Sequence, residues 1–95
     1  MSLTAMARIA LKPVHFDEAQ AAILAIVPRT LAEAGCVQFV VHADASASCI
    51  YLYEEWADDA ALRFHHAQPY TAAVFRAYAE WLAEPVRLET MTRIG

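Results

Sequence analysis

The chain has 95 residues, a length that predicts a single domain spanning residues 1–95. Its net charge of −4, with seven scattered Lys and Arg residues, disfavours a nucleic-acid binder, because binding phosphates requires a basic face. No apolar run approaches the roughly 20 residues of a membrane span, and the N-terminus lacks the pattern of a signal peptide. The expected location is therefore the cytoplasm.

The N-terminal third predicts a strand followed by a helix. Residues 1–4 are expected to be disordered or to derive from cloning, and residues 5–12 form a strand candidate. Asp17 and Gln20 have the spacing of a capping box at a helix start. Apolar residues repeat at helical spacing from there to residue 34, and Gly35 is expected to be the C-cap.

The remaining elements follow from β-branched runs, turn residues and prolines. The segment 36–43 is rich in β-branched and aromatic residues, and 48–56 is expected to return as a hairpin around Ala45-Ser46-Ala47. Asp58 predicts the start of a helix, which Gln68-Pro69 interrupts. A second helical segment at 70–82 and a last strand at 86–94 complete the chain.

The predicted order β-α-β-β-α-β is the split βαβ, or ferredoxin-like, arrangement of the α+β class, with one antiparallel sheet and helices on one face. The other face of the sheet has no cover within one chain, and 59% of the residues are hydrophobic. Both observations favour a homodimer in which two sheets pack face to face. Cys36 and Cys49 fall at opposite ends of the hairpin and are expected to be free thiols.

Alternation along the hairpin predicts a pocket on one face of the sheet. With the turn placed at residues 45–47, the polar side chains that share this face are expected to be Gln38, His42, Glu54 and Trp56, among aliphatic residues such as Leu52. The opposite face, with Phe39, Tyr51 and Tyr53, is predicted to be a packing surface. A slip of one residue would exchange the faces.

A family resemblance rests on an ordered set of short motifs. The set consists of Glu33-x-Gly35-Cys36, a strand ending in His42 and Asp44, Tyr-Leu-Tyr-Glu-Glu-Trp at 51–56, then Asp58, Ala61-Leu62, His65 and Pro69. Together these motifs resemble the antibiotic biosynthesis monooxygenase (ABM) family, in particular its quinol-monooxygenase-like members. The resemblance spans nearly the whole chain and is strongest over residues 33–70.

The resemblance implies a dimeric α+β barrel, and it implies oxidation of a small phenol or quinol by O₂ without a cofactor. Glu54, Trp56 and His65 match the family's Glu, Trp and His. Two departures matter. The chain has no asparagine, although the haem-degrading branch and the actinorhodin-type monooxygenase use one in the pocket, and Phe75 stands near the position of the haem branch's axial His. Haem degradation is therefore not expected.

Cofactor-free oxygenation needs a base that titrates near neutral pH, a dry pocket and an aromatic wall. His65 is the first candidate for the base and His42 the second. Trp56 is expected to stack on the substrate ring, and Glu54 to orient a histidine or the substrate hydroxyl. The substrate-binding candidates are His42, Gln38, Leu52 and Tyr78. No cofactor and no metal are expected, although His42, His65 and Glu54 would form a His₂-carboxylate set if they met.

Each candidate also has a purely structural interpretation. Trp56 would close the core at a strand end, Glu54 would pair with an arginine, His65 would donate to a strand carbonyl, and His66 would face solvent. The alternative function is accordingly a non-catalytic or isomerase-type barrel that binds a small hydrophobic ligand. A pocket lined by Trp56 and His65 would favour catalysis, and a volume filled by side chains would favour the alternative.

Overall fold

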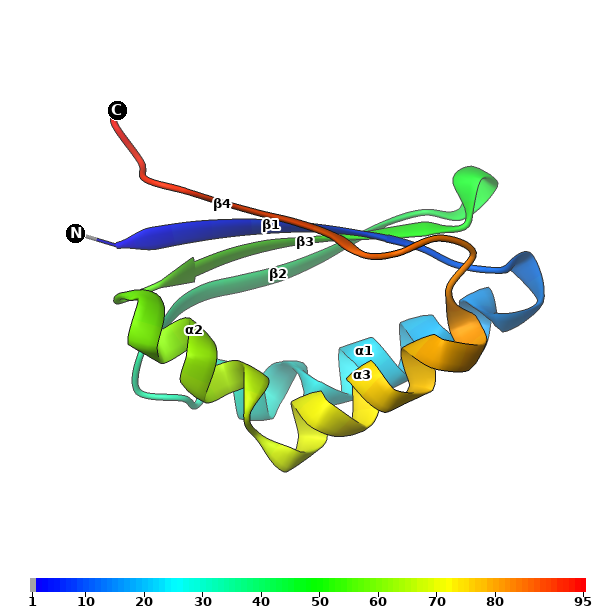
Figure 1. Cartoon of the computed structure of the whole chain (residues 1–95), viewed down its shortest axis with the longest axis horizontal. Helices are drawn as coiled ribbons and strands as arrows, with labels where there is room; N and C mark the ends of the chain where they lie inside the picture. The colour runs from blue at the N-terminus through cyan, green and yellow to red at the C-terminus, as the bar shows by residue number, and fades with distance from the viewer. Residues whose placement is uncertain (1) are drawn as a thin grey trace.

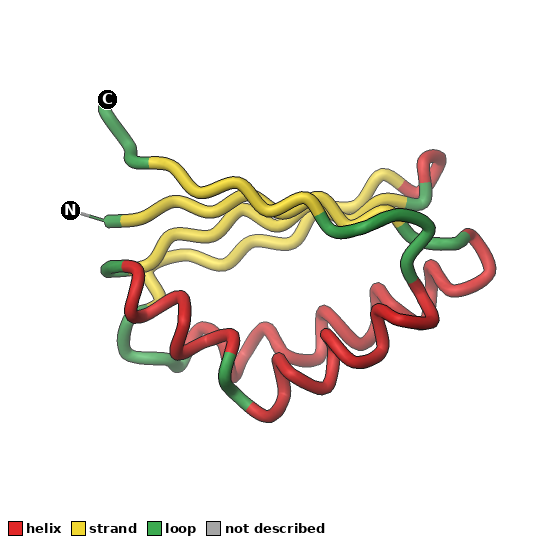
Figure 2. The backbone as a smooth tube through the Cα atoms, in the orientation of Figure 1, coloured by secondary structure: helices red, strands yellow, loops and turns green. Residues whose placement is uncertain are grey.

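The computed structural model describes residues 2–95 as one four-stranded antiparallel sheet with helices packed on one face (Figures 1 and 2). The strands are β1 (Leu3–Ala10), β2 (Cys36–Asp44), β3 (Cys49–Trp56) and β4 (Arg87–Met91), in the spatial order β2-β3-β1-β4. The helices are α1 (Phe16–Leu31), α2 (Asp59–His66) and α3 (Pro69–Trp81), with short 3₁₀ turns at Pro13–His15 and Ala45–Ala47. The predicted ferredoxin-like α+β fold is confirmed.

Two polar residues were predicted to be helix N-caps, and the structure confirms one of them. The Asp58 side chain accepts a hydrogen bond from the Ala61 backbone N–H at 2.8 Å, as expected of an N-cap. Pro69 occupies the first turn of α3, where its missing N–H is not needed. The predicted capping box at Asp17 is wrong: α1 begins at Phe16 with His15 as its N-cap, two residues before Asp17, which lies in the first turn.

The predicted disorder near the N-terminus is wrong for Leu3 and Thr4. β1 begins at Leu3, and Thr4 is buried, so these two residues belong to the sheet and are not disordered. Both pair with β3. The expectation for Met1 lies outside the described residues.

The hairpin register differs from the predicted one by one residue. Asp44 pairs with Cys49, so the loop holds four residues instead of three, and its last residue, Ser48, has φ 53° in the left-handed region. Phe39 therefore pairs with Glu54 on the helical side of the sheet, and Gln38 and His42 face the other way. A bulge between Cys36 and Gln38 returns Cys36 to register with Trp56.

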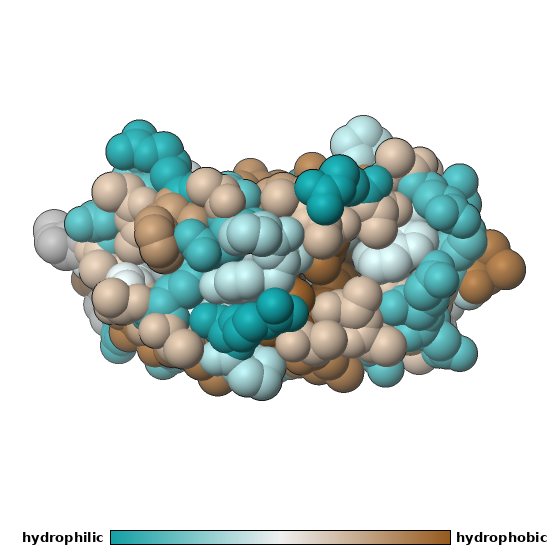
Figure 3. Space-filling view, turned by 90° about the horizontal axis from the view of Figure 1, so that it is seen from below, coloured by the Kyte–Doolittle hydropathy of each residue, from teal (hydrophilic) through white to brown (hydrophobic). Residues whose placement is uncertain are grey.

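The core lies between the sheet and the helices and has two parts. The larger cluster centres on Ile9, Ile23 and Ile50, and the smaller on Ala5, Trp56 and Leu62. Figure 3 looks onto the helical side, where hydrophilic and neutral residues cover most of the surface. Within residues 2–95, no helix combines the length and apolar character needed to cross a membrane.

Candidate active site

His65 lies in the last turn of α2 and is 4% exposed. Its ring stacks on that of Trp56, with 4.8 Å between centroids and 29° between planes. Phe39 packs against the imidazole from β2 at 5.5 Å. The N-cap at Asp58 fixes the start of the helix, and the rings of Trp56 and Phe39 fix the imidazole. The histidine is therefore held rigidly in a nearly dry environment.

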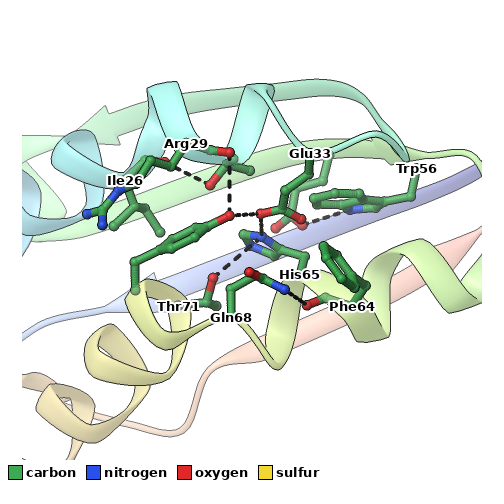
Figure 4. A network of polar contacts seen from close by, with 11 residues as sticks. Ile26, Arg29, Glu33, Trp56, Phe64, His65, Gln68 and Thr71 are labelled. Carbon is green, nitrogen blue, oxygen red and sulfur yellow. Dashed lines mark hydrogen bonds and ion pairs between the residues drawn. The ribbon is translucent and has the colours of Figure 1, made fainter.

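The other side of His65 meets a carboxylate. Its Nδ1 lies 2.9 Å from Oε2 of Glu33, and both side chains are 5% exposed. Figure 4 shows Glu33 reaching His65 from the segment after α1. The Tyr70 hydroxyl donates a hydrogen bond to the same Oε2. Burial, together with this bond, raises the pKa of Tyr70 to about 12, so the phenol keeps its proton and remains a donor at neutral pH.

Glu54 and Trp56 form a second buried pair. The indole Nε1–H of Trp56 donates to Oε1 of Glu54 at 3.0 Å, and Glu54 is 3% exposed. Burial raises the pKa of the Glu54 carboxyl, while the indole hydrogen bond and the neighbouring His65 partly offset that rise. No arginine pairs with Glu54 among the ion pairs of residues 2–95.

A cavity of about 80 Å³ opens beside these groups, between the sheet and the helices. Its lining is mostly apolar, with five polar side chains: Glu54, His65, His66, Thr71 and Tyr78. Burial raises the pKa of Tyr78, so its hydroxyl stays neutral. An apolar space with a few convergent polar groups is typical of a small-molecule site. The volume is below the roughly 300 Å³ of pockets for drug-sized ligands.

Four of the predicted site residues line this cavity: His65, Glu54, Leu52 and Tyr78. Trp56 is absent from the lining and packs behind His65, so its ring stacks on the imidazole and not on the cavity. Gln38 and His42 are exposed on the opposite face of the sheet, and their predicted place in the pocket is wrong. The register shift in the hairpin is the cause.

Sequence reasoning missed or misplaced five residues that matter to the geometry. Glu33 stood in the motif Glu33-x-Gly35-Cys36 without a role, and its spacing was the available signal. Tyr70 and Thr71, at the start of α3, gave no signal, because nothing local shows that this turn approaches His65. Phe39 was assigned to the wrong face. His66, expected in solvent, is half-buried beside the cavity, and burial lowers its pKa.

The His₂-carboxylate alternative is excluded by placement. His42 and His65 lie on opposite sides of the sheet, so they cannot share an ion. Within residues 2–95, no three His, Cys, Asp or Glu side chains converge as a metal site. Cys36 and Cys49 are free thiols at opposite ends of the β2–β3 ladder.

Comparison with known proteins places the chain in a family. The profile described as "Antibiotic biosynthesis monooxygenase" matches residues 2–82. A Pseudomonas aeruginosa protein of known structure is 32% identical, with a TM-score of 0.90 over 99% of this chain and 95% of the other. A Mycobacterium tuberculosis protein has a TM-score of 0.93 at 22% identity, over 100% and 97% of the two chains.

A structure described as an antibiotic biosynthesis monooxygenase also matches, with a TM-score of 0.90 at 21% identity over 98% of this chain and 99% of the other. The search of curated proteins found no match. The two matches near 20% identity are evidence for the fold, whereas the profile and the 32% identical relative are evidence for descent. The chain belongs to the antibiotic biosynthesis monooxygenase (ABM) family.

Proposed function

We propose that the protein is a cofactor-independent monooxygenase that oxidises a small phenol or quinol with O₂. The observation that carries this proposal is the buried His65, which contacts a carboxylate through Nδ1 and lines an apolar cavity. An imidazole in this setting is a suitable general base for a hydroxyl proton. Family membership supports the same reaction class.

The reaction balances without an external reductant. His65 takes the hydroxyl proton, and the resulting electron-rich anion passes one electron to O₂. The two radicals combine at a ring carbon as a peroxide anion, which takes the proton back from His65. The resulting hydroperoxide loses water to give a carbonyl. For a hydroquinone, the net change is quinol plus O₂ giving hydroxyquinone plus water. The substrate supplies all four electrons, and the protein supplies the base and a water-poor site.

The size of the cavity bears on the substrate class. About 80 Å³ suits a single-ring compound better than a polycyclic one. Tyr78 and Glu54 lie on the lining as hydrogen-bonding groups for substrate oxygens, and Leu52 is among the apolar side chains. We therefore place single-ring quinols ahead of anthrones as substrates.

The alternative is a non-catalytic or isomerase-type protein that binds a small hydrophobic ligand. The observation that favours it is the predominantly apolar lining of the cavity, which would hold such a ligand without any chemistry. Saturable binding of a quinol without oxygen uptake would support this alternative over the monooxygenase.

We also propose that the protein acts in the cytoplasm as a homodimer. The sheet face away from the helices carries exposed apolar side chains, including Met6, Val40 and Tyr51. Exposed apolar surface of this kind marks an interaction site, and a second copy of the chain would cover it.

The test follows oxygen consumption by the purified protein with a panel of hydroquinones and anthrones. We expect at least one single-ring quinol to be oxidised well above the rate in buffer, and His65→Ala to lower kcat by roughly 10²–10⁴-fold. His15→Ala is the matched control and should keep wild-type activity, because His15 precedes α1 and is not among the residues that line the cavity. A panel with no acceleration by the wild-type protein would refute the proposal.

A further inference from the structure

The buried carboxylate of Glu33 has an uneven set of partners. Both His65 Nδ1 and the Tyr70 hydroxyl contact its Oε2. The other oxygen, Oε1, is buried and has no hydrogen-bond partner among residues 2–95. Both contacts therefore converge on one oxygen, which ties Tyr70 to the pair formed by His65 and Glu33.

The shared acceptor fixes the tautomer of His65. A carboxylate oxygen only accepts hydrogen bonds, so the 2.9 Å contact with Oε2 assigns the proton to Nδ1, and the Thr71 hydroxyl, 3.5 Å from Nδ1, can accept from the same nitrogen. The lone pair of the neutral ring is then on Nε2. His65 lines the cavity and Glu33 does not, so the imidazole is the member of this pair that a ligand can reach, and Nε2 is its only nitrogen left to accept a proton.

We propose that Glu33 and Tyr70 are positioning residues that hold His65 in the Nδ1-protonated tautomer, so that Nε2 can take a proton from a ligand in the cavity. This inference rests on the proposed function and adds to it the residues that prepare the base. In the step itself, the substrate hydroxyl proton binds Nε2 and the Nδ1 proton stays in place. The positive charge of the imidazolium then faces Glu33.

Burial strengthens the interaction between Glu33 and the imidazolium. Both side chains are 5% exposed, so water screens their charges less than it would at the surface. Glu33 therefore stabilises the imidazolium more strongly than an exposed carboxylate would. Tyr70 is itself held, since the Arg29 guanidinium lies 4.7 Å from the centroid of its ring.

The competing explanation is a buried ion pair with no part in chemistry. Such pairs are common, and they are weak evidence even for stability. The two explanations differ in what the isosteric variant Glu33→Gln changes. Both explanations allow the tautomer and the unfolding temperature to change, but only a positioning role also lowers kcat.

The first experiment reads the tautomer directly by two-bond ¹H–¹⁵N correlation of the histidine rings at neutral pH. His65 is assigned from the spectrum of His65→Gln. We expect wild-type His65 to be in the Nδ1–H form, and Glu33→Gln to shift the population toward Nε2–H, because the amide can donate to Nδ1. A wild-type His65 in the Nε2–H form would overturn the inference, whether or not the protein proves to be an oxygenase.

The second experiment uses the best quinol from the panel. We expect Glu33→Gln to lower kcat by roughly 10²-fold and Tyr70→Phe by about 10-fold, each with KM little changed. Glu80→Gln, an exposed carboxylate on α3, should match wild type. Unchanged kcat in both Glu33→Gln and Tyr70→Phe would overturn the inference while leaving the proposed monooxygenase intact. Tyr70→Phe keeps the test decisive if Glu33→Gln fails to fold.

Discussion

At the scale of single residues, the site is unusual in burying three titratable side chains together. Glu33, Glu54 and His65 are each about 95% or more buried, and ionised groups in such places are costly unless they are paired. Glu33 and His65 pair with each other, whereas Glu54 receives only the neutral indole N–H of Trp56. Of these three side chains, Glu54 is therefore the one whose ionisation destabilises the folded state most.

This cost predicts how stability depends on pH. The pKa of Glu54 is raised by burial, so its protonated form favours the folded state below the pKa of the unfolded chain. That contribution is lost as the pH rises through the folded-state pKa. Glu54→Gln, which keeps an acceptor for Trp56, should raise Tm by a few degrees at pH 8 and by less at pH 5.

Thermal unfolding at both pH values measures the effect. Glu55→Gln, next in sequence but on the opposite face of β3, is the control and should show no such pH-dependent gain. A Glu54→Gln variant that is less stable than wild type at pH 8 would show that the carboxylate is stabilising.

At the scale of elements, Gly35 governs how the chain between α1 and β2 meets α2. Its φ is not positive, and α1 ends before it with Ala32 as the C-cap, so the predicted capping role is wrong. A Cβ built on Gly35 would lie 2.3 Å from the Cβ of Ala61. The glycine is therefore required by close approach, which brings Glu33 within reach of the helix that carries His65.

Adding one methyl group here should destabilise the protein. We expect Gly35→Ala to lower the free energy of unfolding by about 1–3 kcal/mol, the usual cost of overpacking, as measured by urea denaturation. Gly95→Ala is the control, because a Cβ at that position meets nothing within 4 Å. Combining Gly35→Ala with Ala61→Gly removes the clashing atom and should recover part of the loss. Equal stability of Gly35→Ala and wild type would contradict the packing argument.

At the scale of the whole molecule, the main feature is that the two faces of the sheet are covered differently. The helices cover one face (Figure 1), and the other leaves Met6 and Val40 at 47% and 40% exposure. Their strands pair through β3, with Tyr53 between them, so these side chains form one continuous apolar surface. A second sheet packed on this surface would remove it from water.

A charge on this surface should break the assembly. We expect wild-type protein to sediment as a dimer at micromolar concentration and Val40→Lys to shift it toward monomer. Leu24→Lys places the same charge on an exposed leucine of α1, and this control should leave the dimer unchanged. A wild-type monomer in sedimentation velocity at this concentration would contradict the proposed homodimer.

Local sequence patterns were sufficient to predict these helices and strands, because each pattern depends on only a few neighbouring residues. β-branched runs predicted β2 and β3, Asp58 predicted the start of α2, and Gln68-Pro69 predicted the break before α3; all of these appear in the structure. The order of the elements then determined the ferredoxin-like topology. The motif that contains His65 and Glu54 also identified two residues that do line the cavity.

The sequence by itself thus determined the elements, their order, and two residues that line the cavity, His65 and Glu54. The tertiary structure decided which groups meet them. One extra residue in the hairpin loop turned Gln38 and His42 away and brought in Phe39, since side chains alternate along a strand. Glu33 and Tyr70 reach His65 across 32 residues and from the next helix, because contacts between elements depend on packing, which no local periodicity encodes.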